Sequence, residues 1–218
     1  MIHQLRIDVF FDFICPWCLI GKRQLQAAID QLQSNAPDIE VILNWRGVQL
    51  LPHLPSNGVA FKAFYLERLG GESAVLQRQA QVRQAGHAVG VDIDFERISR
   101  MPNTAKAHRL FEKVLKVGTP EQAEMLLERL FSAYFHYSED IGDTSVLLNI
   151  SNSFGFAEFI QSDDLDVSQQ PFISANTGGQ GVPYFVFNDR FALSGAHSAD
   201  TLYKVMLETL AQQQGVLK

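Results

Sequence analysis

The chain has 218 residues, a formal net charge of −6 at pH 7, 46% hydrophobic residues and 19% charged residues. This length suits one large domain or two small ones, and the composition is that of an ordinary globular protein. The acidic balance, without a basic stripe, argues against a nucleic-acid-binding protein. The apolar stretches are of strand length and are interrupted by charges, so we expect no membrane span.

The cysteine usage points to redox or metal chemistry. Only Cys15 and Cys18 occur, and they are too close in the sequence to close a stabilising loop. The N-terminal stretch has no basic segment followed by an apolar one, and Asp8 and Asp12 interrupt it, so we expect no signal peptide and a cytoplasmic protein. In a reducing compartment, a lone C-x-x-C pair is typical of a catalytic or metal-binding site.

The N-terminal quarter predicts a βαβ unit. Residues 5–11 are rich in β-branched and aromatic side chains, as is typical of a strand. Apolar residues recur at helical spacing over 17–33, and the Asn-Ala-Pro-Asp sequence at 35–38 ends that helix. Residues 39–49 predict a second strand. The C-x-x-C pair therefore falls between a strand and the start of a helix.

The middle of the chain predicts helices and no strand. Pro52 and Pro55 break the chain after the second predicted strand. Thr119, followed by a proline and then a glutamine at the third helical position, has the signature of a capped helix start. The candidate helices cover residues 59–69, 72–89, 103–117, 120–137 and 144–154.

The C-terminal quarter returns to mixed structure. Residues 165–176 predict a helix, although Pro171 interrupts its pattern. Residues 184–187 and 191–194 predict two strands around an Asn-Asp turn. A final helix is expected over 198–213.

The two ends of the chain are expected to build one sheet. Each end alone has too few strands to be stable. We therefore predict a discontinuous α/β domain of residues 1–51 and 165–218, interrupted by a helical insertion of residues 52–164.

The position of the cysteine pair suits a nucleophile. The thiolate is the reactive form of cysteine, and a helix N-terminus favours negative charge through its unpaired N–H groups and its dipole. Pro16 fits the first helical turn, where its missing N–H costs nothing. Cys18 lies one turn further on the same face and can reach Cys15. The spacing thus supplies an attacking and a resolving thiol.

Two other interpretations of the pair remain open on spacing alone. A C-x-x-C can be half of a zinc site, but such sites usually need four ligands, and the six histidines of this chain are scattered singly. It can also be an inert buried pair. Its place between a strand and a helix favours redox chemistry over both.

Four segments carry a resemblance to a known family. Residues 11–21 (FDFICPWCLIG) resemble the active-site signature of DsbA-like thioredoxin-fold proteins of the FrnE type. Residues 102–104 (PNT) with 107–109 (AHR) resemble a block of that family's helical insertion. Residues 181–187 (GVPYFVF) resemble the loop that carries the cis-proline of the fold. The closing Ser-Gly-Ala segment matches too, but His197 replaces the usual glutamine.

The resemblance implies an α/β thioredoxin fold with a large all-helical insertion, and thiol–disulfide exchange or isomerisation as the activity. Its substrates would be disulfide-containing proteins or small-molecule thiols, and no cofactor beyond the redox-active disulfide is implied, although glutathione could bind. Some family members have a second cysteine pair, which this chain lacks. The resemblance assigns catalytic roles to Cys15, Cys18 and Pro183, and substrate binding to Pro16, Trp17, Val182, Asn103, Thr104 and His108.

Several of these residues have a second interpretation. Asp12 is either a buried carboxylate that helps Cys18 exchange its proton or a solvated strand end. Asn103, Thr104 and His108 either line a ligand groove or have structural roles, with Thr104 capping a helix and His108 satisfied inside the protein. The role of His197 is open.

Two competing functions follow from the same fold family. Glutathione-dependent enzymes resembling 2-hydroxychromene-2-carboxylate isomerase share the Pro-Asn-Thr block, and there a bound glutathione supplies the sulfur, so that Cys18 would be dispensable. A holdase that binds unfolded chains through the insertion would keep its activity without either cysteine. The presence of both Cys15 and Cys18 favours dithiol exchange.

Overall fold

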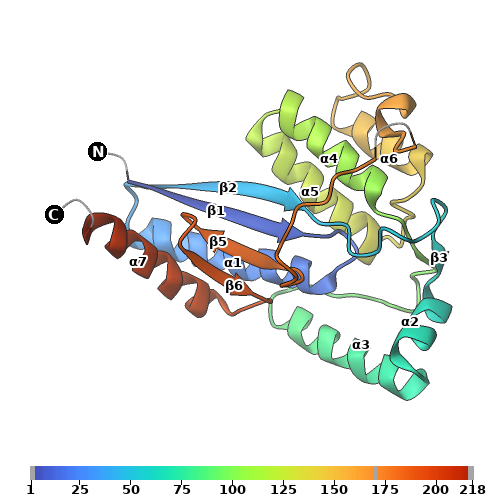
Figure 1. The fold of residues 1–218 in the computed structure, drawn as a ribbon, viewed down its shortest axis with the longest axis horizontal. Helices are drawn as coiled ribbons and strands as arrows, with labels where there is room; N and C mark the ends of the chain where they lie inside the picture. The colour runs from blue at the N-terminus through green and yellow to red at the C-terminus, as the bar shows by residue number, and fades with distance from the viewer. Residues whose placement is uncertain (1–2, 169–170, 216–218) are drawn as a thin grey trace. The chain divides into compact units, whose positions relative to one another are not determined.

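The computed structural model describes residues 3–168 and 171–215, and in it the chain divides into two compact units (Figure 1). The sheet unit comprises the residues up to 48 and those from 175 onward, and the helical unit comprises residues 49–174. The junctions expected from the sequence, after residues 51 and 164, differ from these by three and ten positions. The segment before residue 175 belongs to the helical unit because Phe172 stacks on His108 there.

The ends of the chain do form one sheet, as predicted. Its strand order is β2-β1-β5-β6, with β1 and β2 parallel and the other neighbours antiparallel. Ile7 lies opposite Leu43 on one side and Phe187 on the other, so β1 is a central strand. The strands are β1 (His3–Phe11), β2 (Ile39–Gly47), β5 (Tyr184–Phe187) and β6 (Phe191–Ser194).

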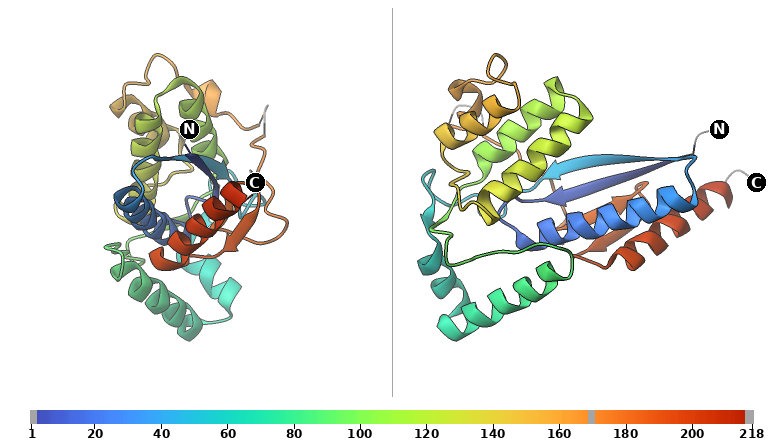
Figure 2. Two further views of the ribbon diagram at one scale, coloured as in Figure 1. Left: turned by 90° about the vertical axis from the view of Figure 1, so that its left-hand side faces the viewer. Right: turned by 180° about the vertical axis from the view of Figure 1, so that it is seen from behind.

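Two helices cover one face of this sheet. Seen from behind in Figure 2, α1 (Pro16–Asn35) and α7 (Ala199–Gly215) lie side by side in front of the strands. Alternate residues of β1 point into this layer, which is why the strand pattern was recognisable in the sequence. Each fully buried aliphatic side chain contributes about 1.5–3 kcal/mol. The core of the layer includes Leu5, Ile7, Val9, Leu25, Leu32, Phe185, Phe187, Leu202 and Met206.

The turn between β5 and β6 has the predicted Asn-Asp chemistry. Asn188 and Asp189 have φ angles of 47° and 56°, in the left-handed region that asparagine and aspartate tolerate. Arg190 N–H closes the turn by donating to Phe187 O at 2.9 Å. Asn188 Oδ1 also accepts from Arg6 N–H at 2.8 Å, which ties the turn to β1.

The helical unit contains the five predicted helices, each ending within two residues of the prediction. Thr119 forms the expected capping box, since its hydroxyl accepts from Gln122 N–H and the Gln122 side chain accepts from Thr119 N–H. Within the described residues, no helix is both long and apolar enough to cross a membrane. The helices are α2 (Phe61–Leu69), α3 (Glu72–His87), α4 (Ala105–Val117), α5 (Pro120–Phe135) and α6 (Thr144–Ser153).

Helices α4 and α5 form the core of this unit. They pack against each other, and α4 also contacts α6 and a short 3₁₀ helix, η1 (Ser162–Leu165). Lys113 on α4 binds Asp164 on η1, with Nζ 2.6 Å from Oδ1. The fully buried side chains of the two helices are mainly leucine and aromatic: Leu110, Phe111, Val114, Leu126, Leu127, Leu130, Phe131 and Tyr134.

The structure corrects two predictions for this unit. The insertion is not all-helical, because β3 (Val59–Ala60) and β4 (Arg100–Met101) pair as a two-residue antiparallel ladder, which is too short to leave a sequence pattern. The helix predicted over 165–176 is wrong. Asp166 Oδ1 accepts from Ser168 N–H in a local turn, and Pro171 opposes a helix. Residues 169 and 170 lie outside the described residues.

Candidate functional site

Cys15 occupies the junction between β1 and α1. It is the N-cap residue of α1, with φ −90° and ψ 108°, and Pro16 takes the first helical position as predicted. Cys15 N–H donates to Asp12 O at 3.1 Å, which fixes the bend between strand and helix. The first turn of α1 holds no acidic side chain, and the side chain of its N-cap residue accepts no capping hydrogen bond from the helix. The Cys15 sulfur is therefore the side-chain group best placed at the helix N-terminus, which favours negative charge.

Cys18 lies one turn along α1 and is more deeply buried than Cys15, with 3% of its surface exposed against 7%. Both cysteines are free thiols. Burial raises the pKa of the Cys18 thiol well above its ordinary value, and its hydrogen bond and charge interaction with Cys15 raise that pKa further. Cys18 is thus held protonated beside the sulfur of Cys15.

Asp12 acts on Cys18 in two opposite ways. A hydrogen bond from the Asp12 backbone lowers the pKa of Cys18, whereas the nearby carboxylate charge raises it. Asp12 is fully buried, so the interpretation of this residue as a solvated strand end is wrong. A charged residue excluded from water beside the cysteine pair fits the alternative, a carboxylate that influences the proton of Cys18.

A second segment reaches Cys15 from the far end of the chain. The peptide bond between Val182 and Pro183 is cis, as the sequence predicts, and Pro183 is buried. The Cys15 thiol donates to the Val182 carbonyl, with 3.6 Å between Sγ and O. The loop before β5 thus places a backbone acceptor directly against the sulfur, and Pro16 and Trp17 flank it as half-buried residues.

One buried residue near this site was given no role by the sequence analysis. Gly21 lies on α1, one turn beyond Cys18, and its Cα faces Pro183 and Phe185. Gly21 closes the family signature over residues 11–21, and a glycine inside a helical pattern indicates a close approach of another segment without identifying that segment.

The remaining predicted site residues cluster at the start of α4, in the helical unit. Asn103 Nδ2 donates to Leu54 O at 2.7 Å, and Asn103 Oδ1 accepts from Gln49 Nε2 at 2.7 Å and from Ala105 N–H at 3.1 Å. The Asn103 side chain therefore has a structural role, because it links Gln49, Leu54 and the start of α4. Gln49 had no recognisable signal in the sequence.

Thr104 and His108 are both almost fully buried. Thr104 holds the N-cap position of α4, but its side chain makes no capping hydrogen bond, so the capping interpretation is wrong in its detail. Asn103 caps the helix instead. The His108 ring stacks on Phe172, with ring centroids 4.8 Å apart and 12° between the planes. This packing agrees with His108 as an interior histidine.

His197 makes local hydrogen bonds with the end of β6. Its Nε2 lies 3.0 Å from Ser194 O, and its backbone N–H donates to Gly195 O at 3.0 Å. These contacts close the segment between β6 and α7. Among the described residues, no three histidine, cysteine or carboxylate side chains are grouped to hold a metal ion.

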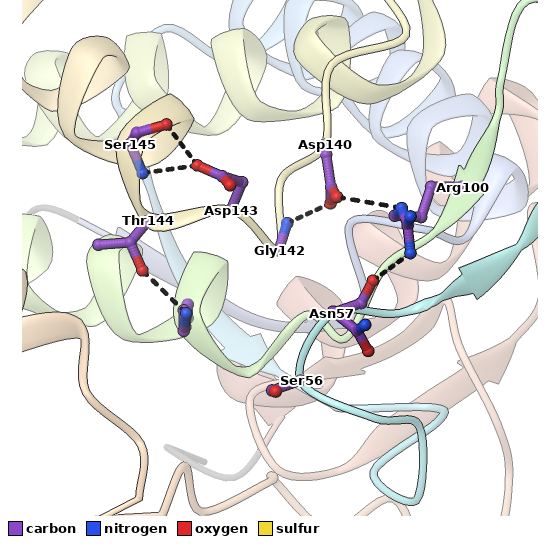
Figure 3. Close-up of a pocket in the computed structure, with 9 residues that line it drawn as sticks. Ser56, Asn57, Arg100, Asp140, Gly142, Asp143, Thr144 and Ser145 are labelled. Carbon is purple, nitrogen blue, oxygen red and sulfur yellow. Dashed lines mark hydrogen bonds and ion pairs between the residues drawn. The ribbon is translucent and has the colours of Figure 1, made fainter.

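The helical unit contains a polar pocket of about 480 Å³, shown in Figure 3. Its cations are already engaged, since Lys106 donates to Thr144 and Arg100 contacts Asp140 and the Asn57 carbonyl. Two acidic and two basic side chains balance in charge, and the pocket contains neither cysteine nor any predicted site residue. The cysteine centre is therefore the stronger candidate for chemistry.

The chain is similar to a known protein family and to a bacterial protein. The family model for the DSBA-like thioredoxin domain matches residues 6–206. The uncharacterised protein YwbO of Bacillus subtilis is 25% identical over 210 residues, which cover 93% of this chain and 96% of that protein.

Two solved structures share the fold. The probable DsbA oxidoreductase SCO1869 of Streptomyces coelicolor superposes with a TM-score of 0.77 at 18% identity, covering 95% of this chain and 90% of the other. The cytosolic disulfide reductase DsbM of Pseudomonas aeruginosa, solved with glutathione, gives 0.59 at 15% identity, covering 97% and 98%. These likenesses confirm the predicted α/β fold with a helical insertion.

Proposed function

This chain belongs to the family of DSBA-like thioredoxin domains, and from that premise we propose that it is a dithiol–disulfide oxidoreductase of the FrnE type. The observation that carries the proposal is the meeting of three groups at one point. The Cys15 sulfur lies at the N-terminus of α1, 3.6 Å from the Val182 carbonyl, and the Cys18 thiol lies behind it.

The first step is attack on a substrate disulfide by the Cys15 thiolate. A new S–S bond forms between Cys15 and one substrate sulfur, and the other substrate sulfur leaves as a thiolate that takes up a proton. The helix N-terminus stabilises the attacking thiolate by about 0.3–1 kcal/mol when exposed, and by more when partly buried.

The second step releases the substrate. Cys18 loses its proton and attacks Cys15, so that the protein disulfide forms and the second substrate sulfur departs as a thiol. Overall, the substrate disulfide gains two electrons and two protons, which the protein dithiol loses. Burial is the main reason why the pKa of Cys18 is raised, and it favours the thiol form of this residue; the part of the rise that comes from Cys15 is lost once Cys15 is bonded to the substrate.

The loop before β5 is proposed to bind substrate. The Val182 backbone can pair with an extended peptide that carries the disulfide, in the manner of an added strand. Pro183 shapes this loop, and Pro16 and Trp17 flank the attacking sulfur. The proposed substrates are disulfides in protein segments or in small thiol compounds.

The roles of Asn103, Thr104 and His108 in substrate binding stay predictions. They lie in the helical unit, where Asn103 and His108 have structural contacts. We also propose a cytoplasmic location, because the two cysteines form no structural disulfide and the pair is suited to turnover.

The test is to trap the mixed disulfide. Cys18→Ser should attack but fail to release its substrate, so covalent adducts with the chains of intact, disulfide-bonded insulin should accumulate on non-reducing gels. Cys15→Ser should abolish exchange, because a serine hydroxyl is a poor nucleophile without a dedicated base. Mass spectrometry should place the adduct on Cys15.

The same variants separate the competing functions. A glutathione-dependent enzyme would keep near-normal turnover of a small substrate in Cys18→Ser, with added glutathione and without a trapped partner. A holdase would suppress aggregation equally well in the double variant that lacks both thiols. Full insulin reduction by Cys18→Ser without adducts would refute the dithiol mechanism.

A further inference from the structure

Gly21 is an unusual residue for its position. It lies inside α1, is buried, and follows Cys18 by three positions. Glycine is the poorest helix former after proline, so a glycine in the first part of a 20-residue helix weakens the element that carries both cysteines. The backbone of Gly21 does not need this freedom, because its conformation is that of an ordinary helix.

The surroundings of Gly21 explain the missing side chain. A Cβ atom built there would lie 3.1 Å from Pro183 Cγ, 3.4 Å from Pro183 Cβ and 3.3 Å from Phe185 Cζ. Carbon atoms in favourable contact are about 3.5–4.0 Å apart. The proline ring therefore packs against the helix more closely than an alanine would allow.

We propose that Gly21 is a positioning residue for exchange with extended substrates, because it seats Pro183 against α1 and so holds the Val182 carbonyl beside the Cys15 sulfur. This inference rests on the proposed function. It adds that the spacing between helix and loop is set by a residue that touches neither sulfur nor substrate.

The inference predicts a particular pattern of defects. A methyl group at Gly21 pushes the loop outward by a few tenths of an ångström, which moves the Val182 carbonyl slightly and leaves both sulfurs in place on α1. A peptide that pairs with the Val182 backbone should suffer, whereas a small disulfide that needs only the sulfur should not. The equilibrium between the protein dithiol and glutathione should also stay unchanged.

The experiment compares Gly21→Ala with the wild-type protein on two substrates. For a peptide disulfide, we expect kcat/KM to fall about tenfold, mainly through KM, since small misplacements at reacting centres have effects of this order. For glutathione disulfide, we expect a change below about twofold. The equilibrium constant with glutathione should stay within about twofold, and rates are expressed per folded molecule.

Two control variants isolate the loop contact. Gly86→Ala introduces the same change at another buried helical glycine, in the helical unit, where the Cβ would lie 2.6 Å from Val91 O. It should lower thermal stability without any preference between the two substrates. Ala27→Ser changes the exposed face of α1 itself and should leave both rates unchanged.

A rescue variant covers the case in which Gly21→Ala folds poorly. Phe185→Leu shortens the other neighbour of the new methyl group, so the double variant should regain part of the peptide rate that Gly21→Ala alone loses. A merely destabilised helix would not be rescued by a second change in the core.

The outcomes are distinct. Equal loss on both substrates, or no loss on the peptide, overturns the role of Gly21 while leaving dithiol exchange intact. Failure of the wild-type protein to exchange disulfides at all would instead overturn the proposed function.

Discussion

The start of α1 in the sheet unit differs from the starts of α5 and α6 in the helical unit. In the helical unit, α5 starts with the Thr119 capping box, and α6 starts at Asp143, whose carboxylate accepts from Ser145 N–H and Val146 N–H. In the sheet unit, α1 starts at Cys15, which makes no side-chain cap. A good N-cap contributes about 1 kcal/mol. The sheet unit gives up that stability where a sulfur occupies the helix N-terminus, as is common at functional sites.

Polar side chains are also used differently in the two units. Asn103 joins three segments of the helical unit through hydrogen bonds that are all satisfied inside the unit. Around Cys15, the corresponding contacts involve the backbone of Asp12 and Val182, and the thiol donates to the Val182 carbonyl. A side chain therefore joins the segments around Asn103, and backbone carbonyls arrange the segments around Cys15.

The largest expected effect on stability comes from removing the three side-chain hydrogen bonds of Asn103. Asn103→Ala leaves Gln49, the Leu54 carbonyl and Ala105 N–H without their partner, and should lower the free energy of unfolding by about 3 kcal/mol. Urea unfolding measures this. Asn57→Ala, a loop asparagine with an exposed side chain, is the control and should change little. Lost substrate affinity at unchanged stability would assign Asn103 to ligand binding instead.

The next effect is a pH dependence that belongs to the sheet unit. The pKa of Cys18 is raised in the folded protein, so the folded state holds this proton more tightly than the unfolded state. Stability is therefore fully present below about pH 8.5, the unfolded pKa, and falls above it by at most about 1.4 kcal/mol per pH unit. Unfolding of reduced wild-type protein and Cys18→Ser between pH 7 and 10 should diverge above that point. Parallel curves would contradict the prediction.

The smallest effects have opposite signs at two helix starts. Asp143→Ala should destabilise the protein by about 1 kcal/mol, because α6 loses its cap. Cys15→Ser should abolish exchange. It should also stabilise the reduced protein by about 0.5 kcal/mol, because a serine side chain is a better N-cap than a cysteine side chain that makes no capping hydrogen bond. Thermal unfolding of both variants decides this. A destabilised Cys15→Ser would show that the thiol has a packing role outweighing the cap.

Local signals in the sequence predicted local structure well. The strands around Asn188 and Asp189 were predicted with their exact bounds, because turn chemistry and alternation agree there. The capping-box signature at Thr119 correctly predicted where α5 begins. The cysteine pair was placed at a helix N-terminus for the same reason, since strand, motif and helix follow each other directly.

What the sequence alone could not supply was contact between distant segments. The contact between Pro183 and Gly21 is marked in the sequence by a glycine, which does not identify the contacting residue. The hydrogen bond between Asn103 and Gln49 has no sequence signal. The false helix over 165–176 has the same origin, because Phe172 is held by packing on His108 and not by a local period. For Val182 and Pro183, the resemblance to the family's cis-proline loop predicted a contact with Cys15 that no local pattern could predict.

The way the insertion closes on itself has a consequence for folding. Its first and last residues, Gln49 and Ser174, are joined by a hydrogen bond of 2.9 Å from N–H to Oγ. The sheet must bring together partners as far apart as Arg6 and Asn188, which are 182 positions apart.

If the helical unit folds first, its 126 residues (174 − 49 + 1) act as a loop of only a few residues. The entropic contribution to the free energy of closing the sheet then falls by roughly 3 kcal/mol. A helical unit that is already folded would thus let β1 and β5 pair as if they were close in the sequence.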